Sequence, residues 1–145
     1  MSNIENKLAA LDFCFEDIKN AIGSMIDGET DFHLDTDGGE FRFIEESQIL
    51  PIAIDEIGSD EYILGCFNDS FIADATDIPF EVIRKLQSSE CFEALGLLIK
   101  SGGHLATWVE DYIDTDGAGH HFAHYDHDET VLEYDGVTYS VFRTN

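Results

Sequence analysis

The strongest structural signal in this sequence lies in its last sixteen residues, TVLEYDGVTYSVFRTN. Two short runs rich in β-branched and aromatic residues, 131–134 and 137–142, stand on either side of Asp135-Gly136. Asp-Gly is a preferred pair for the centre of a type I′ turn, whose twist matches that of two antiparallel strands. The chain is therefore predicted to end in a β-hairpin.

A second hairpin is predicted near the N-terminus. In the stretch TDFHLDTDGGEFRFIEE, apolar residues alternate on both sides of a DTDGG turn, at Phe32 and Leu34 and again at Phe41 and Phe43. From residue 3 to 26, apolar residues recur in steps of three and four, which predicts one amphipathic helix. These residues are Ile4, Leu8, Leu11, Phe15, Ile18, Ile22 and Met25.

The middle of the chain is predicted to be helical. Residues 47–57 are expected to form a short or partly extended element, because Pro51 would lie inside the first turns of a helix. Apolar spacing predicts a helix over 60–75, and Pro79 suits the start of another over about 80–87. A helix capped by Ser88 or Ser89 should reach about residue 100, and 104–113 should form the last one.

Together these elements predict an α+β fold. A helical middle is bracketed by an N-terminal helix plus β-hairpin and by a C-terminal β-hairpin, and the two hairpins share one antiparallel sheet. The 145 residues, 43% of them hydrophobic, suffice for one core, so we expect 1–145 to be a single globular domain. Trp108 is expected to anchor helix packing. Cys14, Cys66 and Cys91 lie on apolar stretches and are expected to be buried free thiols in a reducing compartment.

The net charge of the chain argues against several classes of function. Thirty-one Asp and Glu face seven Lys and Arg, giving a formal charge of −24, and such an excess of like charge destabilises a compact state. A direct nucleic-acid binder or a protein of anionic membrane surfaces needs a basic footprint, which this chain lacks. The N-terminus does not resemble a signal peptide, and we expect a cytoplasmic protein without a membrane span. A basic partner, solubility or a high-salt habitat could each favour the acidity.

The acidic residues concentrate in long stretches without basic residues. No Lys or Arg occurs from 43 to 83 or from 101 to 142. A solvated face is the usual explanation of one short acidic run, but it explains such long stretches less well. Carboxylates three or four positions apart on a helix stand about 5–6 Å apart, which is comparable to successive phosphates of a nucleic-acid strand. The predicted partner-binding array consists of Glu45, Glu46, Asp55, Glu56, Asp60, Glu61, Asp69, Asp74 and Asp77.

In size and composition, the chain resembles the DNA-mimic proteins of phages and mobile elements that block restriction, CRISPR or repair enzymes. Bacterial immunity proteins that neutralise basic nuclease toxins are similar, in that an acidic protein blocks a basic one. The resemblance implies a non-enzymatic inhibitor, anti-restriction or anti-CRISPR in kind, that occupies the basic groove of a nucleic-acid-binding protein and does not touch nucleic acid. It includes no motif, so no functional residues are transferred from it.

One segment suggests different chemistry. Residues 114–130, DTDGAGHHFAHYDHDET, hold four histidines, and imidazole with carboxylate suits several divalent metals. The HHFAH stretch lacks the Glu of an HExxH site, Ala118 takes a ligand position of a calcium loop, and the glycines disfavour a helix. A titratable polar loop is the simpler interpretation, with no cofactor. The alternative is a metal-binding module or metal-dependent enzyme, with candidate ligands His120, His124, Asp114 and Asp116.

Overall fold

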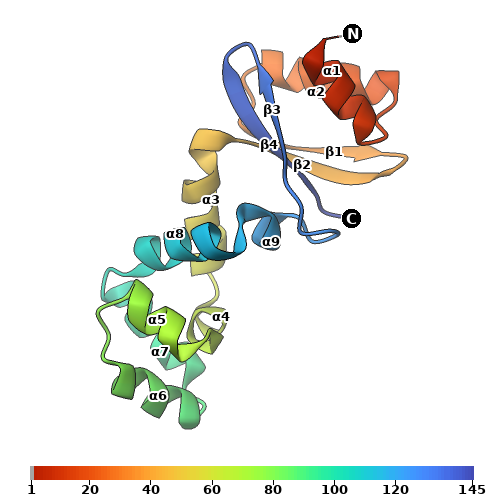
Figure 1. Cartoon of the computed structure of the whole chain (residues 1–145). Helices are drawn as coiled ribbons and strands as arrows, with labels where there is room; N and C mark the ends of the chain where they lie inside the picture. The colour runs from red at the N-terminus through yellow and green to blue at the C-terminus, as the bar shows by residue number, and fades with distance from the viewer. Residues whose placement is uncertain (1) are drawn as a thin grey trace. The chain divides into compact units, whose positions relative to one another are not determined.

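The computed structural model describes residues 2–145, and these contain nine α-helices and one four-stranded antiparallel sheet (Figure 1). The described residues up to Ile49 together with Asp116–Asn145 form one compact unit, here called the sheet unit. Leu50–Thr115 form a second compact unit, here called the helical unit. That the whole chain behaves as a single domain stays a prediction.

The two predicted hairpins are confirmed, and they share one sheet. Strands β1 (Asp31–Thr36) and β2 (Gly39–Glu45) form the first, and β3 (Thr130–Tyr134) and β4 (Val137–Arg143) form the second. The strand order is β1-β2-β4-β3, so the hairpins meet where β2 pairs with β4. Asp135 and Gly136 have φ angles of 52° and 79°, the positive values that a type I′ turn requires.

One face of this sheet is covered by α1 (Asn3–Ala10) and α2 (Phe15–Ile26), as Figure 1 shows. Alternate strand residues point into the resulting core, where Phe32 stacks on Phe43 with ring centroids 4.7 Å apart. The buried residues of this core are Ile4, Leu8, Phe13, Ile18, Ala21, Met25, Phe32, Phe41, Phe43, Leu132, Tyr139 and Val141.

The prediction of one helix from 3 to 26 was wrong, because the chain turns between α1 and α2. Asp12 adopts a φ of 65°, which no continuing α-helix allows. The turn brings Phe13 into the core, with its ring 4.8 Å from that of Phe41. The apolar repeat runs through the turn without interruption, because both helices cover the same face of the sheet.

The opposite face of the sheet contacts α9 (Ala118–Phe122), a helix that the glycine content of this segment had disfavoured. The Phe122 ring lies 5.1 Å from that of Phe142, and the Arg42 guanidinium lies 5.1 Å above Phe122. Gly119 is needed for close approach rather than for flexibility, because a Cβ there would collide with the His127 carbonyl. The glycine in this short helix therefore reflects packing.

The helical unit contains α4 (Glu61–Cys66), α5 (Asp69–Ala75), α6 (Phe80–Ser88) and α7 (Phe92–Ser101), with most of α3 (Glu46–Gly58) and α8 (Leu105–Asp116). Contrary to the expectation for 47–57, α3 is a regular helix that includes Pro51. Pro51 is its sixth residue, so the hydrogen bond that proline cannot donate would have reached only the first turn.

The predicted helix over 60–75 is two helices, α4 and α5. Asn68 starts the second, because its side-chain oxygen accepts hydrogen bonds from the backbone N–H groups of Ser70 (2.9 Å) and Phe71 (3.3 Å). Helix α6 is confirmed, with Pro79 itself at the N-cap, whereas α7 is capped at Cys91 rather than at Ser88 or Ser89.

Helices α4 and α7 cross with almost no space between their backbones. A Cβ on Gly65 would collide with the carbonyl of Phe92, and a Cβ on Gly96 would collide with the carbonyl of Glu61. Both glycines are buried, so the crossing depends on the missing side chains.

The prediction that Trp108 anchors helix packing is confirmed. Its side chain is fully buried, at 0% exposure, against the rings of Phe67 (4.6 Å), Phe71 (5.5 Å) and Tyr112 (5.7 Å). These residues bring α5 and α8 together around the α4–α5 junction. Among the described residues, Nε1 of Trp108 is a buried donor without a hydrogen-bond partner.

Candidate functional site

The nine carboxylates of the predicted array all remain accessible to solvent. Five are exposed, Glu46, Asp55, Asp60, Asp74 and Asp77, and the other four are partly exposed. Glu45 and Glu46 belong to the sheet unit, and the remaining seven belong to the helical unit. The array is therefore a surface feature, distributed over the end of β2, the helices α3–α5 and the segments that follow α3 and α5.

Regular helical spacing does not organise the array. Asp55 and Glu56 are neighbours on α3, and Asp69 and Asp74 are five positions apart on α5. Asp60 and Asp77 lie just outside helices, so no two members share a helix three or four residues apart. The helical spacing of three or four residues, on which the comparison with successive phosphates rests, does not occur within the array, because the chain breaks after α3 and between α4 and α5.

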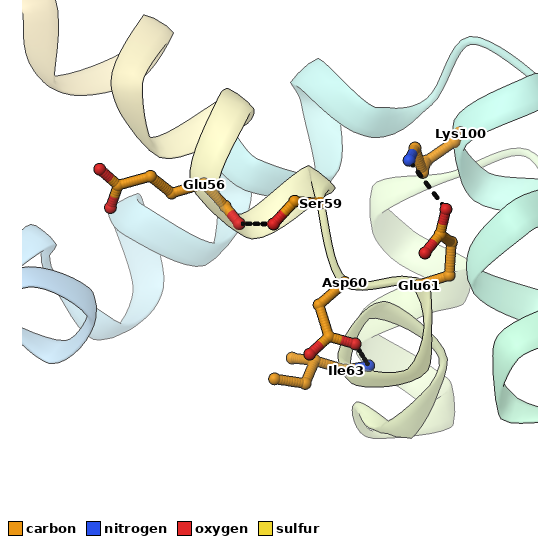
Figure 2. Close-up of polar contacts among 6 residues, drawn as sticks. All are labelled: Glu56, Ser59, Asp60, Glu61, Ile63 and Lys100. Atoms are coloured by element: carbon orange, nitrogen blue, oxygen red, sulfur yellow. Dashed lines mark hydrogen bonds and ion pairs between the residues drawn. The ribbon is translucent and has the colours of Figure 1, made fainter.

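Two array members also stabilise the local structure around α4 (Figure 2). Oδ1 of Asp60 accepts a hydrogen bond from the Ile63 N–H at 3.2 Å and thereby caps α4. Glu61 forms an ion pair with Lys100 at 3.0 Å, which links α4 to α7. The hydrogen bond of Glu61 with its own backbone N–H, followed by the contact with Lys100, holds the pKa of Glu61 below its ordinary value.

Two further members of the array accept hydrogen bonds from nearby serine side chains. Ser47 Oγ donates to Glu45 at 2.8 Å, and Ser70 Oγ donates to Asp69 at 3.4 Å. In Figure 2 the Glu56 carboxylate points away from the pair of Glu61 and Lys100. The exposed side chains of Glu46, Asp55, Asp74 and Asp77 are thus the ones best placed to meet a partner without disturbing a cap.

Basic residues do little to offset the charge of the helical unit. Its sequence holds thirteen Asp and Glu against three Lys and Arg. Lys100 is engaged with Glu61, and the Arg84 guanidinium lies 5.6 Å above the Phe80 ring. A strongly negative potential around this unit follows from its composition.

The histidine-rich segment lies mainly in and after α9. The rings of His120 and His127 are 5.0 Å apart, and the ring of His121 lies 4.6 Å from that of Phe122. Asp114 and Asp116 are at the end of α8, and His124 follows α9. Within residues 2–145, no group of three or more His, Cys, Asp or Glu side chains is placed to hold a metal ion. Metal binding by His120, His124, Asp114 and Asp116 stays a prediction.

The cysteine prediction was wrong in one respect. Cys14, Cys66 and Cys91 are free thiols, as expected, but all three are exposed rather than buried. Cys14 and Cys91 lie at the N-caps of α2 and α7, and Cys66 ends α4, so their apolar neighbours in sequence face the core without them.

The sequence reasoning also missed an apolar groove beside α2. It is lined by Phe15, Ile18, Lys19, Ile22, Gly23 and Ile26 of α2 and by Glu5 of α1, and has a volume of about 550 Å³. The apolar repeat of this helix predicted only that it is amphipathic. The signal that could have revealed the groove is the width of the apolar arc, which exceeds what one face of the sheet can cover.

The chain matches no family model, and no curated protein or solved structure is significantly similar to it. None of the helices described between residues 2 and 145 has the length and apolar character needed to cross a membrane.

Proposed function

We propose that this protein is a non-enzymatic, acidic interaction protein that inhibits a nucleic-acid-binding or nucleic-acid-processing protein by occupying its basic groove. The observation that supports the proposal is the accessibility of all nine array carboxylates, seven of which belong to the helical unit, whose helices are held in place by caps, an ion pair and a glycine crossing. Ordered carboxylates can present a fixed negative pattern to a basic surface, as phosphates do.

The charge distribution favours a basic macromolecular partner over solubility alone. Solubility needs a net charge magnitude of only about 2–8 in a small domain, and this chain has −24. Association driven by such a surface should be fast and should weaken with salt, because exposed charges are screened beyond about 8 Å at physiological ionic strength.

A pull-down from host lysate with the full chain as bait, in about 50 mM and about 500 mM NaCl, tests the proposal. We expect basic nucleic-acid-binding proteins to be recovered at low salt and released at high salt. The recovered protein should then lose its DNA or RNA when the chain is added in a competition assay. Recovery of no basic nucleic-acid-binding protein at low salt, or failure to compete, would overturn the proposal.

Two matched variants separate the array from overall charge. One neutralises the exposed array members, with Glu46→Gln, Asp55→Asn, Asp74→Asn and Asp77→Asn. The control neutralises four exposed acids of the hairpins, with Asp35→Asn, Asp37→Asn, Glu133→Gln and Asp135→Asn. Both lose the same charge, so a loss of affinity of about tenfold or more in the first variant alone would locate the contact on the array. Equal losses would show that net charge, rather than this surface, governs binding.

A further inference from the structure

Helix α2 has large apolar side chains that the core of the sheet unit leaves exposed at both ends of the helix. Its inward residues Ile18, Ala21 and Met25 are buried, whereas Phe15 and Ile26 are 82% and 66% exposed. The groove of about 550 Å³ runs along the helix between these two exposed side chains. Large apolar side chains grouped at the rim of a groove, on a protein otherwise rich in charge, indicate a surface that another molecule covers.

The charge of this groove differs from that of the rest of the molecule. Its charged lining residues are Glu5 and Lys19, which cancel each other, in a chain of net charge −24. A strongly basic partner therefore gains little here. Because the lining has no net charge, a copy of the groove can face it without repulsion between the two linings.

The order of the lining residues along α2 is also symmetric. The six positions lie at equal distances on either side of the midpoint between Asn20 and Ala21. If two α2 helices pack antiparallel about a two-fold axis at this midpoint, every lining residue meets another lining residue. The pairs are Phe15 with the partner's Ile26, Lys19 with the partner's Ile22, and Ile18 with the partner's Gly23.

Close approach of the two helices is possible at the glycine. A Cβ built on Gly23 would have nothing within 4 Å, so the space beside this residue is open. An antiparallel pair also places each positive helix N-terminus beside the negative C-terminus of its neighbour.

We propose that the protein forms a symmetric dimer through antiparallel α2 helices. Glu16 and Asp27 flank the two ends of the groove, and the pairing brings each Glu16 toward the partner's Asp27. This repulsion, added to that between two highly charged chains, weakens the dimer at low salt. The dimer presents two copies of the acidic array.

Sedimentation equilibrium of the full-length protein at about 50 and about 500 mM NaCl tests the dimer. We expect a monomer–dimer equilibrium whose association constant rises about tenfold or more at the higher salt, because screening removes the repulsion. Binding of a basic partner to the array should change with salt in the opposite direction. Failure of one proposal is therefore distinguishable from failure of the other. A monomer at both salt concentrations and all protein concentrations would overturn the dimer.

A charge-pair experiment tests the register. Phe15→Glu places an acid in the first turn of α2 and Ile26→Lys places a base in its last turn, both favourable for the helix itself. Each single variant should weaken dimerisation at least tenfold. The double variant should recover it, because the introduced charges face each other across the axis, and its dimer should weaken rather than strengthen with salt.

Leu97→Glu on α7 is the matched control, since Leu97 is 56% exposed and lies outside the groove. It should leave the association constant unchanged, and circular dichroism should show that all variants are folded. A folded double variant that dimerises no better than the single variants would overturn the register. Equal weakening by Leu97→Glu would overturn the assignment of the interface to α2.

Discussion

The close crossing of α4 and α7 predicts that a Gly→Ala substitution destabilises the protein at the crossing and stabilises it at an open helical position. At Gly65 and Gly96 the added methyl group would collide with the backbone carbonyls of Phe92 and Glu61. These atoms cannot rotate away as a side chain can, so the two helices must separate. At Gly23 of α2, the methyl group meets nothing within 4 Å.

The expected change in the free energy of unfolding is the sum of two terms. Alanine is more favourable than glycine in a helix by about 1 kcal/mol, and this gain applies at all three sites. Overpacking a buried site typically costs about 1–3 kcal/mol, and we expect the upper end where the neighbour is backbone. Gly65→Ala and Gly96→Ala should therefore lower the free energy of unfolding by about 2 kcal/mol each. Gly23→Ala should raise it by up to about 1 kcal/mol.

Urea unfolding followed by far-ultraviolet circular dichroism measures these differences. Dilute protein at low salt keeps the chain monomeric, so that dimerisation does not contribute. If Gly65→Ala or Gly96→Ala stabilises the protein as Gly23→Ala does, the close approach of α4 and α7 is wrong. The same Gly23→Ala variant should weaken the proposed dimer while stabilising the monomer, because it fills the space opposite the partner's Ile18.

Other measurable consequences concern one ion pair and the histidine-rich segment. Two hydrogen bonds of 2.8 Å from Arg42 hold the pKa of Asp31 below its ordinary value of 3.8. Their stabilisation is present above that value and is lost as pH falls through the lower folded pKa. Asp31→Asn should therefore lower the free energy of unfolding by about 1 kcal/mol at neutral pH, and chemical unfolding at lower pH should show this cost disappear as the carboxyl group becomes protonated. Elemental analysis should find no stoichiometric divalent metal in the wild type; a stoichiometric metal that the double variant His120→Ala, His124→Ala loses would instead support the metal-binding alternative.

The hairpins could be predicted from sequence because their signals are local. The Asp135-Gly136 turn and the alternation of Phe41 and Phe43 each specify a strand or turn within a few residues. Once two hairpins with apolar faces are predicted, a shared sheet is a natural way to bury both. The α+β fold follows from these short-range patterns.

The helix boundaries could not be predicted as well, because the deciding contacts are distant in sequence. The left-handed turn at Asp12 exists because Phe13 packs against Phe41 of the sheet. The break before Asn68 lets Phe67 reach Trp108, forty-one positions further along the chain. Periodicity reports which residues are apolar, and it does not report whether the same core face is covered by one helix or by two.

The acidic array shows which part of the candidate site could be predicted from the sequence and which part could not. Composition correctly indicated a surface that basic residues barely offset, since that property depends only on which residues are present. The arrangement of Asp60, Asp69 and Asp77 at or near helix ends depends on where α3, α4 and α5 stop. The exposure of Cys66 was missed for the same reason, because a residue at a helix end can face solvent amid apolar neighbours.

The burial of Trp108 gives the chain a built-in optical reporter. It is the sole tryptophan, it is enclosed by three aromatic rings in the helical unit, and its indole N–H lacks a hydrogen-bond partner among the described residues. Its fluorescence should therefore be blue-shifted in the folded protein and should report the unfolding of Leu50–Thr115 alone. Comparing this emission with the circular dichroism of both units, in one urea titration, will reveal whether the two units unfold as a single cooperative domain.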